Sequence, residues 1–296
     1  MCIRDSAATV ETLGGLLGTR STLNLVLGGR RLDRRVAIDV GRIHYDFIRY
    51  CGTTGSDAAA GYAWIPASTE LRADDKVAII GAAGPMGLMH TMRSVVLGVE
   101  GVSITATDLS DDRLAHLADV IDPAAARAGV GVRYLNTGSE PLGSGYTYLT
   151  CMVPVPALVA AAVDAAADGA IVNAFAGISA GTTADIDLQG VVERRVWLFG
   201  TSGSDIADMT AVVRRIEAGQ IDTTISLDAV TGIAGFADAI TSVIERTSGG
   251  KIMVFPSLHD LGLVRLVDLP DKLPHVAEHL KNGLWTVEAE RALLGG

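Results

Sequence analysis

The segment from residue 76 to residue 108 constrains the fold of this chain more than any other part. It holds a short apolar run, a turn with Gly81, Gly84 and Gly87, a helix-like stretch, and a second apolar run that ends at Asp108. A Rossmann βαβ unit has this order, because glycines let backbone amides approach a pyrophosphate at the N-terminus of a helix. The segment therefore predicts a dinucleotide-binding site between a strand and a helix.

The residues around the glycines indicate which dinucleotide fits. Pro85 suits the first helical turn, where its missing N–H has no intrahelical partner. Asp108 follows Gly87 by about 20 residues, the distance at which a carboxylate binds the ribose hydroxyls of NAD. Because a 2′-phosphate would be repelled there, we expect NAD, with NADP as the second choice. We interpret Arg113 as part of the exposed first turn of a helix capped by Ser110.

The candidate cofactor contacts lie in this turn, at the acid and at the ends of two later strands. They are Gly81, Ala83, Gly84, Pro85, Met86, Gly87, Asp108, Val153, Phe175, Ala176 and Gly177. A structural interpretation stays open for the turn, in which its glycines only let a helix pack against a strand.

The composition narrows the class of protein. Of the 296 residues, 49% are hydrophobic, which fits a sheet covered by helices on both faces. The net charge of −10 argues against nucleic acid as a partner, since nucleic acid needs a basic face. No apolar run reaches the roughly 18 residues that a bilayer span needs, so we expect no membrane partner. The three cysteines show no paired spacing, which predicts neither disulfides nor a cysteine zinc site and favours a reducing cytoplasm.

The alternation of strands and helices predicts an α/β fold with a doubly wound, mainly parallel Rossmann sheet over residues 73–256. Strands are expected at 76–80, 102–107, 132–136, 148–153, 170–175, 196–201 and 251–255, and helices at 85–98, 111–121, 156–167, 205–218 and 236–247. Residues 257–296 are expected to form a polar C-terminal extension that ends in one amphipathic helix.

An internal repeat connects the N-terminal part with this domain. The pair Ile-Asp at 38–39 recurs at 186–187, and G-T-T-G-S-D at 52–57 recurs as G-T-S-G-S-D at 200–205, each about 150 residues later. Such a spacing is the size of one nucleotide-binding domain. We therefore expect residues 7–72 to hold the tail of an upstream α/β unit and a linking helix. Convergence of two similar strand–turn–helix junctions is the alternative.

The first residues look unlike a natural start. Residues 1–6, MCIRDS, lack the charged leader and apolar core of a signal peptide and resemble translated adapter sequence. We expect a non-native leader here and a fragment that lacks an upstream segment.

Taken in order, these motifs resemble the medium-chain, zinc-type alcohol and polyol dehydrogenases. LRADDKVAIIG at 71–81 is similar to the beginning of their coenzyme domain, and G-P-M-G at 84–87 to their G-P-x-G turn. The family's later strands are matched in order by residues 170–177, 196–203 and 249–254. The repeated Gly-Thr-x-Gly-Ser turn and RIHYD at 42–46 look most like the sugar and sugar-phosphate branch, which includes sorbose-1-phosphate reductases. The likeness covers about residues 36–256.

The resemblance implies an oxidoreductase that transfers hydride between nicotinamide and an alcohol or carbonyl of a sugar, sugar phosphate or polyol. A small-molecule substrate and a homo-oligomer are the partners it implies. A dinucleotide-binding module that senses or scaffolds without turnover is the alternative.

The chain departs from this family at the zinc sites. It has no Gly-His-Glu triplet and no cluster of four cysteines, so we assign no metal ligand and no catalytic residue. Either the zinc domain lies upstream or this branch does not use it. His44, Tyr45 and Asp46 are interpreted as polar residues of an exposed strand end, with the lining of a substrate cleft as the alternative. His90 is interpreted as a packed or solvent-facing histidine rather than an acid–base group. The H-x-x-E-H pattern at 275–279 is assigned to the polar terminal helix.

Overall fold

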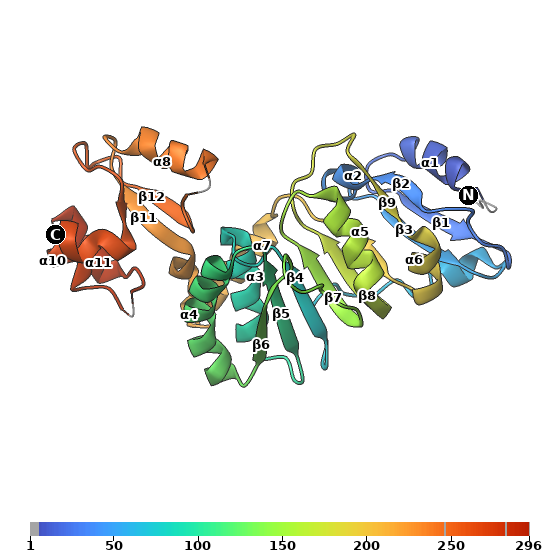
Figure 1. The fold of residues 1–296 in the computed structure, drawn as a ribbon, viewed down its shortest axis with the longest axis horizontal. Helices are drawn as coiled ribbons and strands as arrows, with labels where there is room; N and C mark the ends of the chain where they lie inside the picture. Colours follow the sequence, from blue (N-terminus) through green and yellow to red (C-terminus); the bar gives the residue numbers. More distant parts are fainter. Residues whose placement is uncertain (1–5, 246, 282, 296) are drawn as a thin grey trace.

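The computed structural model describes residues 6–245, 247–281 and 283–295; the predicted leader therefore lies, except for Ser6, outside the described residues. The central feature is a six-stranded parallel sheet in the order β10-β8-β7-β4-β5-β6 (Figure 1). Its strands are β4 (Lys76–Ile80), β5 (Ser103–Asp108), β6 (Gly131–Asn136), β7 (Tyr146–Cys151), β8 (Ala166–Ala174) and β10 (Trp197–Phe199). The order runs outward from β4 in both directions, which confirms the predicted doubly wound Rossmann-type fold.

Helices cover both faces of this sheet, because its strands are apolar on both sides. These helices are α3 (Pro85–Val96), α4 (Asp111–Ala128), α5 (Pro156–Ala165) and α6 (Leu188–Arg194). Helix α7 (Ile206–Glu217) follows β10 and buries none of its residues. In β4, Val77 and Ile79 join the core that α3 and α4 cover, whereas Ala78 and Ile80 join the core beneath α5. This alternation is what a strand with successive side chains on opposite faces produces.

Helix α4 begins as the sequence predicts and ends later. Ser110 caps it, with its hydroxyl accepting a hydrogen bond from the amide of Arg113 at 3.3 Å. The sequence predicted an end at residue 121, but the helix continues through Pro123 to Ala128. The extra turns bury Ala124 and Ala125 in the same core as the earlier helical leucines, and Gly129 ends the helix in the left-handed region.

The N-terminal part forms a smaller unit beside this sheet. Its elements are α1 (Ala7–Gly15), β1 (Thr22–Val26), β2 (Val36–Asp39), α2 (Val40–Tyr45) and β3 (Arg49–Thr53). Strands β1 and β3 pair in parallel, and β2 pairs antiparallel with β9 (Thr183–Ile186) of the main domain.

The linking segment contradicts its prediction. A short helix that ends near Pro66 was expected within residues 56–70, but the helical structure described there is a single 3-10 turn, η1 (Ala58–Gly61). Gly61 and Pro66 interrupt any longer helix. Trp64 instead ties the linker to β3, donating its indole N–H to the carbonyl of Gly52 at 2.8 Å.

The C-terminal part also differs from its prediction. The strand expected as the last one of the Rossmann domain, β12 (Lys251–Val254), pairs with β11 (Leu227–Thr231) in a separate sheet of order β12-β11-β13. The expected polar extension packs onto this sheet and forms a lobe of its own (Figure 1). Besides β11 and β12, this C-terminal lobe consists of η2 (Thr223–Ser226), α8 (Phe236–Ile244), β13 (Val264–Arg265), η3 (Leu266–Asp268), α9 (Leu269–Lys272), α10 (Pro274–Ala277) and α11 (Val287–Leu294).

A shared apolar core explains this lobe. Val230 and Phe255 from the new sheet pack with Leu269, Val276 and Trp285 from the segment that the sequence suggested was polar. Among the helices that the structure describes, none has the length and apolar character needed to span a membrane.

Candidate functional site

The glycine turn joins β4 to α3 at the point where the strand order reverses. Gly81 has φ +81°, and its amide and that of Ala82 donate to the carbonyl of Thr107 at 3.0 and 2.7 Å. A Cβ atom on Gly81 would lie 2.5 Å from Cγ1 of Val153, and one on Gly87 would collide with the carbonyl of Gly81. Backbone packing therefore requires glycine at these two positions.

Gly84 is different from the other two glycines of the turn. It precedes α3 in extended backbone, with Pro85 at the first helical position and no side chain capping the helix. A Cβ atom on Gly84 would meet no atom closer than Nη2 of Arg113, at 3.7 Å. The amides of Met86 and Gly87, in the first turn, have no acceptor within the helix. The free space at Gly84 thus lies beside free amide donors. Packing within the protein does not by itself explain why residue 84 is a glycine.

Asp108 lies beside this turn at the end of β5. Its side chain is largely buried, and Oδ1 accepts a hydrogen bond from the amide of Leu109 at 2.9 Å. Nη2 of Arg113 lies 3.5 Å from Oδ2 of the same carboxylate. Arg113 does stand in the first turn of α4, as the sequence suggested, but its guanidinium extends back over the space between Asp108 and Gly84.

The remaining candidate residues lie along the same carboxyl edge. Val153 follows β7 and contacts Gly81, as described above. Ala176 follows β8, and its amide donates to the carbonyl of Cys151 at 2.9 Å. Phe175 places its ring 4.5 Å from that of His90 in an edge-to-face contact. The structure thus brings together the ends of β5, β4, β7 and β8, where ligands bind in doubly wound sheets.

Two residues of the N-terminal unit reach this edge, which contradicts the sequence interpretation. His44 and Tyr45 stand in α2 rather than at an exposed strand end, and His44 is buried with Nδ1 3.3 Å from the carbonyl oxygen of Ala174. A Cβ atom on Gly177 would lie 2.7 Å from the hydroxyl of Tyr45. Asp46 follows α2 and accepts a hydrogen bond from Nε of Arg42 at 2.7 Å. The approaches of His44 to Ala174 and of Tyr45 to Gly177 join distant segments, so no local pattern could have indicated them.

The surroundings of both histidines near this edge disfavour the charged form of the imidazole. Burial lowers the pKa of His44, against a smaller opposing effect of its contact with Ala174. Burial also lowers the pKa of His90, whose Nδ1 lies 2.9 Å from the carbonyl oxygen of Met86. With Nδ1 engaged in each case, Nε2 is left as an acceptor.

The described residues do not form a zinc site. Among them, no three histidine, cysteine, aspartate or glutamate side chains gather closely enough to hold a metal ion. His275 and His279 belong to the C-terminal lobe, away from the sheet edge. The residues present therefore do not fit the catalytic zinc of the family, and we derive no step through it.

Comparison with known proteins gives a consistent likeness. No model of a protein family matches the chain. Mannitol-1-phosphate 5-dehydrogenase of Aliivibrio fischeri is 26% identical over 240 residues, which make up 74% of this chain and 56% of the relative. The crystal structure of benzyl alcohol dehydrogenase from Acinetobacter calcoaceticus superposes with a TM-score of 0.52 at 16% identity, covering 64% of this chain and 52% of that one.

The chain resembles the medium-chain alcohol and polyol dehydrogenases. The 2R,3R-butanediol dehydrogenase of Bacillus subtilis is a further structural neighbour, with a TM-score of 0.48 and 20% identity over 64% of this chain and 53% of that one. At 16% identity the benzyl alcohol dehydrogenase structure shows the fold alone. This chain spans about half the length of the dehydrogenases it matches.

Proposed function

We propose that this chain binds NAD(H) at the carboxyl edge of its six-stranded sheet and serves as the coenzyme-binding part of a dehydrogenase. The observation that carries the proposal is the space at Gly84. Packing accounts for Gly81 and Gly87, whereas Gly84 leaves room in front of unpaired helix amides. A dinucleotide pyrophosphate fits that combination of free volume and free donors.

The candidate residues take distinct parts in this proposal. The amides of Met86 and Gly87, with the positive end of α3, bind the phosphates. Asp108 accepts hydrogen bonds from the adenosine ribose, and Val153, Phe175, Ala176 and Gly177 contact the nicotinamide half. The nicotinamide, when bound, supplies the hydride chemistry.

The comparisons support an alcohol, polyol or sugar phosphate as the substrate. The curated relative is named for the oxidation of mannitol 1-phosphate, and acetophenone reductase from Geotrichum candidum was solved with NAD. TarJ of S. aureus was solved with NADPH, so structural neighbours have been solved with either coenzyme. Because this chain spans about half of its relatives, the complete reaction and the substrate belong to this proposal. The cytoplasmic location that the cysteine content predicts stays a prediction.

Calorimetric titration of the chain with NADH and with NADPH tests the proposal. We expect saturable binding of NADH at one site per chain, with NADPH weaker. The absence of saturable binding by either nucleotide would contradict the assignment of this edge as a coenzyme site.

A further inference from the structure

The pairing of β2 with β9 is symmetric about its own centre. The antiparallel register pairs Val36 with Ile186 and Ala37 with Asp185. In the internal repeat, Ile38 corresponds to Ile186, so Ala37 corresponds to Asp185. Strand β2 therefore pairs with its own copy in the repeat, β9. The central pair, Ala37 and Asp185, consists of equivalent residues. A two-fold axis passing between them relates the two strands.

The neighbouring elements obey the same relation. In the N-terminal unit β1 pairs with β3 in a register that sets Leu23 opposite Tyr50. In the main domain β8 pairs with β10 with Val172 opposite Leu198. Leu198 follows Tyr50 by 148 residues, and Leu23-Asn24 recurs as Val172-Asn173 with a shift of one residue, so the two pairs are equivalent in the repeat.

The helices that follow the paired strands are capped in the same way. The carboxylate of Asp39 caps α2 by accepting from the amide three residues later, at 3.2 Å. Asp187, its equivalent in the repeat, caps α6 by accepting from the amide three residues later, at 2.9 Å. Both copies of the repeat thus have the same local fold. Convergence of two similar turns would not by itself give the copies the same strand pairing and the same helix caps.

Contacts across the axis are reciprocal. A Cβ atom on Gly52 would lie 2.5 Å from the carbonyl oxygen of Leu25 and 2.6 Å from a side-chain methyl of Val192, in α6. A Cβ atom on Gly200, the equivalent of Gly52, would lie 2.8 Å from the carbonyl oxygen of Ala174 and 2.8 Å from Cα of His44, in α2. The absence of a side chain at each glycine therefore leaves room for the helix of the other copy of the repeat. Reciprocity of this kind defines the interface of a two-fold symmetric dimer.

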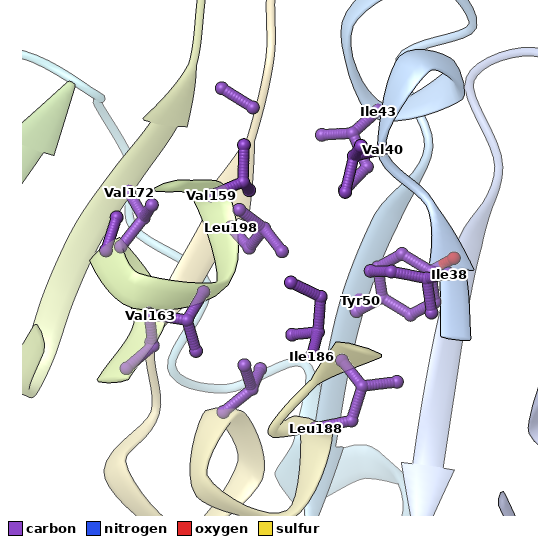
Figure 2. Packing of buried hydrophobic residues seen from close by; sticks show 14 of the residues in the cluster. Ile38, Val40, Ile43, Tyr50, Val159, Val163, Val172, Ile186, Leu188 and Leu198 are labelled. Carbon is purple, nitrogen blue, oxygen red and sulfur yellow. The ribbon is translucent and has the colours of Figure 1, made fainter. Parts of the chain in front are cut away.

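One apolar core fills the space between the two copies. Figure 2 shows Ile38 and Tyr50 on one side and Val172 and Leu198 on the other, with Ile186 close to the middle. All five are buried in the same cluster. The N-terminal unit therefore covers apolar surface of the main domain as a second subunit would.

We propose that residues 7–57 act as a built-in second subunit. They pair with β9 and cover α6 and β10, the edge strand of the six-stranded sheet, on the side where a second copy of this chain would otherwise pair about a true two-fold axis. An edge strand left open is a template for pairing with another chain, and here the same polypeptide covers it. The chain consequently does not self-associate through this edge.

Cysteine cross-linking tests the proposal, in a background with Cys2→Ser. Residues directly opposite in an antiparallel pair have Cα atoms about 4.5–5.5 Å apart, within the range that a disulfide bridges. The double variant Ala37→Cys/Asp185→Cys should form a disulfide within one chain, seen as a shifted monomer band on a non-reducing gel. The single variant Asp185→Cys should stay monomeric under the same oxidation. Cys51 and Cys151 are buried and do not compete.

The same variants can overturn the proposal. If a second copy occupied the edge, residue 185 would face residue 185 of that copy, and Asp185→Cys alone would give a covalent dimer. A cross-link between two chains in the double variant, or no cross-link at all, would equally refute an internal partner. Ser139→Cys/Asp185→Cys is the matched control, because Ser139 is exposed beyond β6 at the opposite side of the sheet, and it should form no internal disulfide.

Discussion

Gly84 lies where a side chain would compete with a ligand rather than with the protein. We expect Gly84→Val to weaken NADH binding by at least about tenfold, or about 1.4 kcal/mol, because the valine would fill phosphate volume. The melting temperature of the free chain should change little, since the nearest atom to a Cβ there is 3.7 Å away. Calorimetry gives the affinity, and melting curves with and without NADH give the stability.

Gly131→Val is the matched control for that variant. Gly131 begins β6 at the amino edge of the sheet, and a Cβ atom there would meet no described atom within 4 Å. Its affinity for NADH should equal that of the unmodified chain. The phosphate-binding role of Gly84 fails if Gly84→Val melts at a lower temperature yet keeps the full ligand-induced shift.

Asp108 and Arg113 together should set the coenzyme preference. The carboxylate disfavours a 2′-phosphate, whereas the guanidinium 3.5 Å away favours it. We expect Asp108→Ala to reduce the ratio of the affinity for NADH to the affinity for NADPH by about tenfold. The further change Arg113→Ala should lower the affinity for NADPH again. Titrations with both nucleotides measure this, and Asp112→Ala in the same helical turn serves as control. Tighter binding of NADPH by the unmodified chain would refute the role given to Asp108.

His44 and His90 should make the stability of the chain depend on pH. Their folded-state pKa values lie below the usual 6.5, so the unfolded chain binds protons more readily. Their contribution is complete above pH 6.5 and is lost as the pH falls below it. Urea unfolding should give a lower free energy of unfolding at pH 5.5 than at pH 7.5. This difference should be smaller in His44→Asn and in His90→Asn. The exposed His116→Asn should leave the pH dependence unchanged, and an equal loss in all three variants would contradict the assignment.

At the scale of single elements, the cap of α4 offers a direct test. Ser110→Ala removes the acceptor for the amide of Arg113 and should lower the free energy of unfolding by about 1 kcal/mol. Ser110→Asp keeps an acceptor and should retain most of the stability. Urea unfolding without ligand measures both variants. Equal stability of Ser110→Ala and the unmodified chain would show that the cap contributes nothing.

Elements with a strong local signal were predictable from the sequence. The apolar run before Gly81 and the helix after Pro85 match β4 and α3, and their order determined the doubly wound sheet. Helix α4 was predicted to end at residue 121, but it continues through Pro123, because the burial of Ala124 and Ala125 offsets the missing hydrogen bond. Rules that consider only neighbouring residues count the missing hydrogen bond but not the burial.

Contacts between distant segments were not predictable in the same way. Lys251–Val254 has the apolar character of a Rossmann strand, and only its pairing with Leu227–Thr231 assigns it to another sheet. The candidate cofactor residues were placed at one sheet edge by the order of strands alone. The approach of Tyr45 to Gly177 required the pairing of β2 with β9, for which the sequence gives no register.

At the scale of the whole molecule, the buried residues that the structure describes form three apolar cores. One lies between the main sheet, α5 and the N-terminal unit, a second beneath α3 and α4, and a third within the C-terminal lobe. The third shares no buried residue with the other two. Ile225 in η2 joins the second core, and the lobe begins at this attachment.

The pairing of β2 with β9 also has a consequence for synthesis on the ribosome. Val36 cannot meet Ile186 until about 150 further residues have been translated, which takes on the order of ten seconds at about 5–20 residues per second. During that delay the apolar faces of α1 and β2 have emerged without the surface that later covers them. Closure of such a long loop is slow compared with local folding. The N-terminal unit therefore reaches its final place only after β9 has left the ribosome.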